Sequence, residues 1–180
     1  IAGTRQRDGR RVVIAHLDTG YDPGQVTRPA RLRLDLQRNF VSGDGAPNDA
    51  TDRVPPGMAF LRNRGHGTAT LALLAGNRLD GTSPGWNGFA DFLGGAPLAD
   101  VIPIRIADWV VRFSVGTMVQ GFDHARRSGA HVLSMSMGGV SSRALVDAVN
   151  LAYEAGIVLV TAGGNNFADR PMPRTIVFPA

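Results

Sequence analysis

The sequence predicts an α/β fold in which a mainly parallel β-sheet lies between helices on both of its faces. Short apolar runs of strand length alternate along the chain with segments that have helical spacing. This alternation favours parallel strands joined by right-handed crossovers. Hydrophobic residues make up 43% of the 180 residues and charged residues 19%, so the chain is able to bury a core of ordinary size. The expected architecture therefore has three layers.

The first strand is predicted at Arg11–Leu17, an apolar run that stops at the turn formers of Asp18-Thr19-Gly20. Its continuous apolar character indicates burial on both faces. Residues 39–64 are rich in Gly, Pro, Asp and Asn and are expected to form irregular surface. Thr68–Ala75 is compatible with a helix, which Gly76 and Asn77 would end.

The second half of the chain repeats the order of strand and helix. A strand is predicted at Val101–Ile106, then a helix from Val115 to near Gly129. A strand at His131–Met137, a helix at Ser142–Ala155 and a strand at Ile157–Thr161 follow. Both helices are predicted from apolar residues spaced three and four apart, at Val115, Met118, Val119, Phe122 and Ala125 and at Leu145, Ala148, Val149 and Ala152.

Nothing in the sequence divides the chain into two domains, because it has no internal repeat and no linker between self-sufficient halves. Residues 1–11 are expected to be an N-terminal extension. The last residues, Thr175–Ala180, have the pattern of an apolar strand that runs into a turn. We therefore expect residues 1–180 to be part of a domain that is truncated at its C-terminus.

Composition excludes several classes of protein. All 19 basic residues are arginine, and they are scattered without interleaved aromatic residues, so the net charge of +4 does not indicate nucleic-acid binding. No apolar stretch approaches the roughly 18 residues of a membrane-spanning helix. The absence of cysteine excludes disulfides, zinc–thiolate sites and a thiol nucleophile.

Glycine-rich polar segments follow three of the predicted strands, where chemistry collects in a parallel sheet. They are Asp18-Thr19-Gly20, Ser136-Met137-Gly138-Gly139 and Gly163-Gly164-Asn165-Asn166. A carboxylate at the end of a buried strand, such as that of Asp18, is able to hold an imidazole in one tautomer. An aspartate before Thr-Gly is also ordinary turn chemistry, so this motif alone leaves both interpretations open.

His66 is the histidine best placed for general-base chemistry. It lies between Gly65 and Gly67 just before a predicted helix, so its imidazole meets little steric obstruction. Histidine titrates near neutral pH, as a general base requires. His16 lies within an apolar strand, His124 on the polar side of a helix and His131 at the start of a strand, so these three are interpreted as structural.

Four segments, in this order, resemble signature motifs of the subtilisin-like serine proteases, or subtilases. They are Val13–Gly20, Gly65–Thr68, Val132–Gly139 and Val158–Asn165. A fifth segment, Gly95–Arg105, resembles the turn and strand that follow the family's histidine helix. Any one of these motifs is weak, but five in the family's order are specific. The resemblance covers the chain from about Val12 to Ala180.

The resemblance implies a serine endopeptidase that hydrolyses peptide bonds through an Asp-His-Ser triad and an acyl-enzyme. Asp18 would be the triad acid, His66 the base and Asn165 the donor to the oxyanion. By the same resemblance, the substrate would lie beside three short segments: Ser136, Met137 and Gly138 as one wall of the primary specificity pocket, Ala162, Gly163 and Gly164 as the opposite wall, and Val111, Arg112 and Phe113 as a second edge along the peptide.

The family's nucleophilic serine has no counterpart in this sequence. It belongs to a Gly-Thr-Ser-Met-Ala-x-Pro motif that comes after the oxyanion asparagine, and no serine follows Asn165. Gly81-Thr82-Ser83-Pro84 mimics the triplet, but it precedes Asn165 and lies in a loop rich in Gly and Pro. We therefore expect the serine beyond residue 180 and no triad hydrolysis by these residues alone.

The sequence also departs from the family's pattern at three positions. Leu71 is bulkier than the usual residue and is expected to pack against the sheet. Phe113 stands where small residues are usual, so it would reshape the distal part of the substrate site. Gly163 replaces a residue that is often alanine, which would loosen the pocket wall.

Other functions stay open at this point. One is a catalytically inactive subtilase relative that acts as a peptide-binding module. Another is an aspartic peptidase that uses Asp18-Thr19-Gly20, but such enzymes pair two of these loops on an all-β fold. Dinucleotide binding has little support, because no Gly-x-Gly-x-x-Gly pattern follows the first strand.

The resemblance implies no required cofactor. Structural calcium is frequent in the family, and Asp44, Asp49 and Asp52 have oxygens to offer, but their spacing forms no clear ligand motif and no metal ligands are predicted. The expected partners are polypeptide substrates. By resemblance, the protein is expected to be a monomer that is secreted or held in the cell envelope.

Overall fold

Five parallel strands form the main sheet in this computed structural model, which describes residues 6, 9–41, 46–52, 65–108, 111–112, 115–164 and 177–180. The strand order is β2-β3-β1-β5-β7, and each neighbouring pair is parallel. The five strands are β1 (Val13–Asp18), β2 (Arg38–Asn39), β3 (Asp100–Arg105), β5 (Val132–Met135) and β7 (Val158–Thr161). The prediction of a mainly parallel sheet is confirmed.

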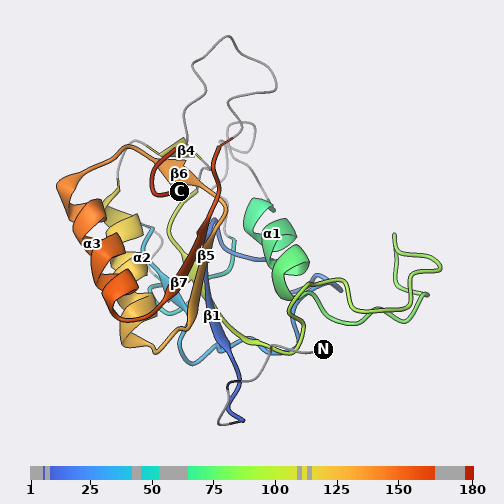
Figure 1. The fold of residues 1–180 in the computed structure, drawn as a ribbon. Helices are drawn as coiled ribbons and strands as arrows, with labels where there is room; N and C mark the ends of the chain where they lie inside the picture. Colours follow the sequence, from blue (N-terminus) through green and yellow to red (C-terminus); the bar gives the residue numbers. More distant parts are fainter. Residues whose placement is uncertain are drawn as a thin grey trace.

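Helices cover both faces of this sheet (Figure 1). α1 (His66–Ala75) lies on one face, and α2 (Gly116–Arg127) and α3 (Arg143–Glu154) lie together on the other. α3 begins after Ser142, whose hydroxyl accepts a hydrogen bond from the Leu145 N–H at 3.2 Å. This is the usual way in which a serine satisfies the first turn of a helix. The three-layer α/β architecture expected from the sequence is therefore confirmed.

Three short strands were not predicted as strands. β2 lies at the start of the segment that the sequence indicated as irregular surface, and its Asn39 is buried. β4 (Val111–Arg112) and β6 (Gly138–Gly139) pair in parallel as a separate small sheet. Each of these strands has two residues, too few for an alternating pattern to be visible.

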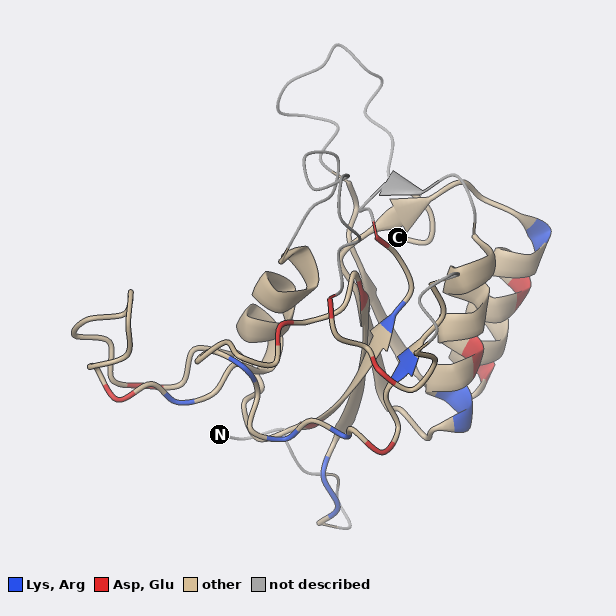
Figure 2. Ribbon diagram, turned by 180° about the vertical axis from the view of Figure 1, so that it is seen from behind, with Lys and Arg blue, Asp and Glu red and all other residues tan. Residues whose placement is uncertain are grey.

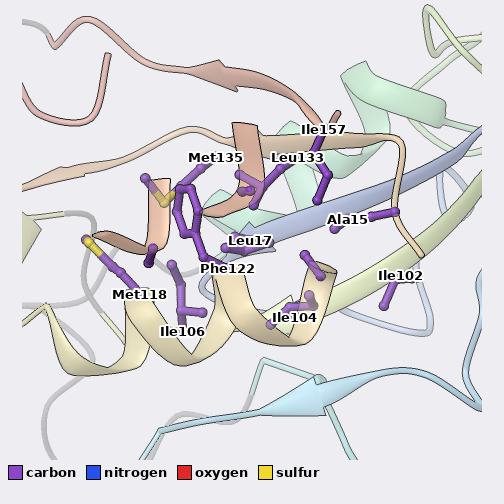
Figure 3. Close-up of a cluster of buried hydrophobic side chains, with 14 of the residues drawn as sticks. Ala15, Leu17, Ile102, Ile104, Ile106, Met118, Phe122, Leu133, Met135 and Ile157 are labelled. Atoms are coloured by element: carbon purple, nitrogen blue, oxygen red, sulfur yellow. The ribbon is translucent and has the colours of Figure 1, made fainter. Parts of the chain in front are cut away.

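The larger part of the core lies between the sheet and the α2–α3 layer. Figure 3 shows Met118 and Phe122 of α2 directed toward side chains of the sheet, among them Leu17 of β1. Gly121 of α2 comes so close to the sheet that a Cβ atom there would lie 2.8 Å from Ile106 Cγ2 and 2.9 Å from Leu17 Cδ2. α2 is therefore packed directly above the carboxyl end of β1, which is buried from Ile14 to Asp18.

A second, smaller cluster holds α1 on the opposite face. Leu71 is among its members, and the expectation that this bulky residue packs against the sheet agrees with its place in the same cluster as Val101 of β3. The buried residues of this cluster are Tyr21, Ala50, Leu71, Ala75 and Val101.

The parallel register brings the carboxyl ends of the central strands to one edge of the sheet. Asp18 at the end of β1 is aligned with Arg105 of β3, and Leu17 with Met135 of β5. Met135 is in turn aligned with Thr161 of β7. The described residues that directly follow these strands therefore begin at the same edge, as expected for a sheet of this kind.

Charged residues occur on several separate elements of the fold. Figure 2 shows arginines and acidic residues on the loops below the sheet and on the outer sides of α2 and α3. Among the residues that the structure describes, no helix is both long and apolar enough to span a membrane.

Candidate active site

The carboxylate of Asp18 is the centre of the site. It ends β1, is completely buried, and its Oδ1 accepts a hydrogen bond from the Thr19 backbone N–H at 2.7 Å. The same oxygen lies 2.7 Å from Nδ1 of His66. Because an ionised carboxylate only accepts hydrogen bonds, Nδ1 carries the proton and donates it. A buried charge persists only when donors of this kind compensate for lost water.

Two glycines allow His66 to reach this carboxylate. Gly65 has a left-handed backbone, with φ of 75°, and forms the turn into α1. Gly67 lies directly against the loop after β1, where any side chain would collide with the carbonyl oxygen of Gly20. The N–H of Gly67 donates to the hydroxyl of Thr19 at 3.1 Å. The start of the helix is therefore fixed against the loop that carries Asp18.

The two partners shift each other's protonation. Burial acts to raise the pKa of Asp18, but the hydrogen bond from His66, together with the nearby His16 and the Thr19 N–H, outweighs it and lowers that pKa. The hydrogen bond to Asp18 raises the pKa of His66 against a smaller opposing effect of burial. The site therefore favours an ionised Asp18 next to a basic imidazole.

These shifts define the pH range in which the pair stabilises the fold. The contribution of His66 is complete below its ordinary pKa of 6.5 and is lost as the pH rises through its raised folded value. That of Asp18 is complete above 3.8 and is lost as the pH falls through its lowered folded value. Both contributions are complete between these two ordinary values.

The geometry gives the site its chemical capacity. With Nδ1–H bound to Asp18, the neutral imidazole keeps a lone pair on Nε2, and the His66 side chain is 25% exposed. It is therefore able to take a proton from a group outside the protein core, while Asp18 stabilises the resulting positive charge.

The other histidines lie in different surroundings. Nε2 of His124 is 2.7 Å from the Leu36 carbonyl oxygen, and Nδ1 of His131 accepts a hydrogen bond from the Val13 N–H at 3.1 Å. His16 is buried, as expected, but its Nε2 lies 3.8 Å from Asp18 Oδ2 and 2.9 Å from the hydroxyl of Thr70.

The positions of His16 and Thr70 next to Asp18 were not predicted from the sequence, although the spacing of these residues from Asp18 and His66 indicates them. Residues two apart on a strand face the same side, which relates His16 to Asp18. Residues four apart on a helix are neighbours, which relates Thr70 to His66. The structure brings both pairs together at one carboxylate.

The two predicted pocket walls lie side by side and are joined by hydrogen bonds to a third segment. The Val177 N–H donates to the Gly163 carbonyl at 3.2 Å, and the Gly139 N–H donates to the Phe178 carbonyl at 3.1 Å. The side chain of Val177 packs directly onto Gly138. No sequence motif indicates that Val177 and Phe178 lie beside these segments, because the residues that they contact are distant in the sequence.

The remaining predicted substrate residues are placed as follows. Met137 is 1% exposed and belongs to the hydrophobic core, so its side chain is not available to a ligand. Val111 pairs with Gly138, and Arg112 with Gly139, which brings these two segments together. Asn165 and Phe113 lie outside the described residues.

Ser83 is remote from this arrangement. Its hydroxyl donates to Asp80 Oδ1 at 3.2 Å, and the same oxygen accepts hydrogen bonds from the N–H and hydroxyl of Thr82. In Figure 1 the loop between α1 and β3 projects away from the sheet. Ser83 thus serves a local turn, and its interpretation as a mimic of the catalytic triplet stays a prediction.

Three other aspartates near the site accept hydrogen bonds from backbone N–H groups. Asp22 Oδ1 accepts from the Gly24 N–H at 2.8 Å, Asp49 Oδ1 from the Thr51 N–H at 3.0 Å, and Asp52 Oδ2 from the Gly65 N–H at 3.1 Å. Within the described part of the chain, no group of three or more His, Asp or Glu side chains is arranged so that it could hold a metal ion. Asp44 lies outside that part, and the expectation about calcium stays a prediction.

A hollow of about 710 Å³ adjoins the site. It lies between α1, the turn at Asp22 and the loop that carries Trp86. Gly65 and Thr68 line it, whereas Asp18 and His66 do not. The acid–base pair is therefore next to this hollow rather than inside it.

The chain belongs to the subtilase family, whose family model matches residues 9–180. It is 30% identical over 159 residues to the thermostable alkaline protease of Halalkalibacterium halodurans, covering 88% of this chain and 36% of that protein. It is also 30% identical over 173 residues to subtilisin DY of Bacillus licheniformis, covering 96% and 53%. The chain thus spans about half or less of the length of these relatives.

Solved structures show the same fold. The protease domain of PatA, in its S218A mutant form, superposes with a TM-score of 0.63 at 20% identity, covering 99% of this chain and 56% of that one. MycP1 with its N-terminal propeptide removed gives a TM-score of 0.56 at 25% identity, covering 89% and 45%. The subtilisin-like α/β fold predicted from the sequence motifs is therefore confirmed.

Replacing Asp18 with asparagine is expected to lower the pKa of His66, because the carboxylate that raises it loses its charge. NMR titration of the imidazole resonances measures this pKa. Asp22→Asn is the matched control, since Asp22 holds an adjacent turn through the Gly24 N–H. The same His66 titration in the parent and in Asp18→Asn would contradict this electrostatic account.

Proposed function

We propose that these residues form part of a serine endopeptidase in which Asp18 and His66 are the acid and base of an Asp-His-Ser triad. The observation that carries this proposal is the 2.7 Å contact between a fully buried carboxylate and an imidazole at the carboxyl edge of a parallel sheet. Membership of the subtilase family supports the reaction class.

In the proposed mechanism, Nε2 of His66 takes the proton of a serine hydroxyl as that oxygen attacks the peptide carbonyl. Asp18 stays ionised and stabilises the imidazolium, which then gives its proton to the leaving amine. Water repeats the attack on the acyl-enzyme and releases the acid. The lowered pKa of Asp18 and the raised pKa of His66 both support these roles.

The nucleophilic serine is proposed to belong to a segment of the protein beyond residue 180. No serine follows Asn165 in this sequence, and the relatives are considerably longer than the chain. Asn165 is proposed as the side-chain donor that stabilises the oxyanion, a role worth a few kcal/mol in acyl transfer.

The peptide substrate is proposed to bind in extended form beside the segments that follow β5 and β7. Backbone pairing with such segments supplies affinity, and pockets between them supply side-chain preference. The contact between β4 and β6 supports a common site for Val111–Phe113 and Ser136–Gly138. We further propose a monomer that needs no cofactor for the reaction and acts in the cell envelope or outside the cell.

Two alternatives predict different behaviour. An inactive relative that binds peptides would keep the proposed peptide-binding segments but would not react with a serine-directed reagent. An aspartic peptidase would share a proton between two carboxylates, whereas Asp18 is hydrogen-bonded to a histidine and lies on an α/β fold. The pairing with His66 therefore favours the serine mechanism.

The full-length protein is expected to react with a fluorophosphonate at one serine located after residue 180. His66→Ala is expected to reduce both this labelling and peptide hydrolysis by about three orders of magnitude or more, because the base and the nucleophile act as a unit. Mass spectrometry of the labelled peptides identifies the serine. His124→Ala serves as a control for loss of a structural histidine. Labelling of Ser83, or full activity of His66→Ala, would refute the proposed mechanism.

A second prediction concerns which substrate side chain the primary specificity pocket accepts. Val177 packs onto Gly138 between the two proposed walls, so it should favour small residues before the cleaved bond. Val177→Ala is expected to increase the preference for phenylalanine over alanine at that position by about tenfold or more in kcat/KM. Val140→Ala, an exposed valine just after β6, is the control. An unchanged preference would show that Val177 does not limit the pocket.

A further inference from the structure

Behind the Asp18–His66 pair lies a second set of polar side chains that the reaction does not use directly. His16 is 3% exposed and Asp18 is 0% exposed. Thr70 of α1 stands between them, with its hydroxyl 2.9 Å from His16 Nε2 and 2.9 Å from Asp18 Oδ2. The direct separation of His16 Nε2 and Asp18 Oδ2 is 3.8 Å. This is too long for a hydrogen bond, so the hydroxyl bridges the two residues.

We propose that His16 and Thr70 are positioning residues for the catalytic carboxylate, joined in a hydrogen-bonded series from His16 through Thr70 to Asp18, here called the buried relay. The series holds Oδ2 of Asp18 so that Oδ1 faces His66, and it moderates the negative charge that His66 experiences. Its catalytic consequence rests on the proposed function, whereas its effect on the resting site does not.

The direction of each hydrogen bond follows from the chemistry of the groups. Ionised Asp18 has no proton to give, so the Thr70 hydroxyl donates to Oδ2. The hydroxyl has one proton, so its oxygen accepts from Nε2–H of His16. The hydroxyl also lies 3.2 Å from the carbonyl oxygens of His66 and Gly67. A charged acceptor at a shorter distance makes the stronger bond.

His16 acts in this series as a neutral imidazole. Burial lowers the pKa of His16, and this outweighs the opposing attraction of Asp18. The imidazole is then an uncharged donor in the interior of the protein. It supports the carboxylate without introducing a second positive charge next to His66.

The two carboxylate oxygens of Asp18 accept hydrogen bonds from different donors. Oδ1 accepts from the Thr19 N–H and from His66, whereas Oδ2 accepts from Thr70. A buried carboxylate oxygen that loses its donor bears the cost of desolvation in full. The two sets of donors together leave the carboxylate one favourable orientation, and the orientation of the imidazole follows from it.

The relay also affects the basicity of His66. Each donor to Asp18 draws negative charge away from the side that faces the imidazole, so removal of a donor should raise the pKa of His66. Among the described residues, the titratable groups that act on the pKa of Asp18 are His16 on β1 and His66 on α1, and Arg105 of β3 is aligned with Asp18 in the sheet. Arg105 is hydrogen-bonded to Asp108 at 2.6 Å and stays unchanged in the variants below.

The test uses the full-length protein with two variants that remove one link each. Thr70→Val removes the hydroxyl with little change of shape, and His16→Val removes the imidazole. Thr70→Ser keeps the hydroxyl and should recover most of what Thr70→Val loses. His124→Gln, which alters a histidine bound to the Leu36 carbonyl on another part of the fold, is the matched control.

The first readout is the titration of His66 by NMR in the resting protein, which requires no catalysis. We expect a higher pKa of His66 in Thr70→Val and in His16→Val, and parental behaviour in His124→Gln. Because the relay is a series, adding His16→Val to Thr70→Val should give less than the sum of the two single shifts. If either variant fails to fold, the other still measures the shift.

The second readout is the pH profile of kcat/KM, whose acid limb should move to higher pH in both variants. At the pH optimum we expect a loss of about 10- to 100-fold, mostly in kcat, as for a hydrogen bond to a charged group. An unchanged His66 titration in both single variants, or fully additive shifts, would overturn the relay. A protein without hydrolytic activity would instead refute the proposed function, while the NMR result would still decide the relay.

Discussion

The hydrogen bond between the buried carboxylate of Asp18 and Nδ1 of His66 is the interaction on which the arrangement of the site depends. A charge with no exposed surface is tolerated only when donors surround it. The Thr19 N–H, the His66 imidazole and the Thr70 hydroxyl supply them from the loop after β1 and from α1. The position of α1 is therefore tied to the protonation state of one side chain.

Several positions near the end of β1 require glycine because neighbouring segments approach each other closely there. Gly67 has to be glycine because the Gly20 carbonyl occupies the space of a side chain, and Gly20, with φ of 99°, has to be glycine for its backbone conformation. On the opposite face, Gly121 lets α2 lie directly on Leu17, one residue before Asp18. Helices on both faces thus hold the end of β1 where the chemistry is proposed.

Much of the fold and part of the candidate site could be predicted from the sequence. Apolar runs predicted the longer strands, and apolar residues spaced three and four apart predicted α2 and α3, to within a few residues. α1 was predicted from a helix-compatible segment that Gly76 and Asn77 would end. β2, β4 and β6 were not predicted, since two residues carry no period. Asp18 and His66 were singled out by turn chemistry and motif. The contact of Val177 with Gly138 could not be predicted, because it joins segments far apart in the sequence. The buried relay had a periodic signal, but a histidine in an apolar strand was interpreted as structural.

Asp18 is held ionised inside the protein by its hydrogen-bond donors. The most direct test is an NMR titration of the carboxyl carbon of Asp18 in the full-length protein. We expect Asp18 to stay ionised to a pH below its ordinary pKa of 3.8, because its donors outweigh the effect of burial. Uptake of the proton by the carboxyl group above that value would show that burial dominates and that the donors do not hold Asp18 ionised.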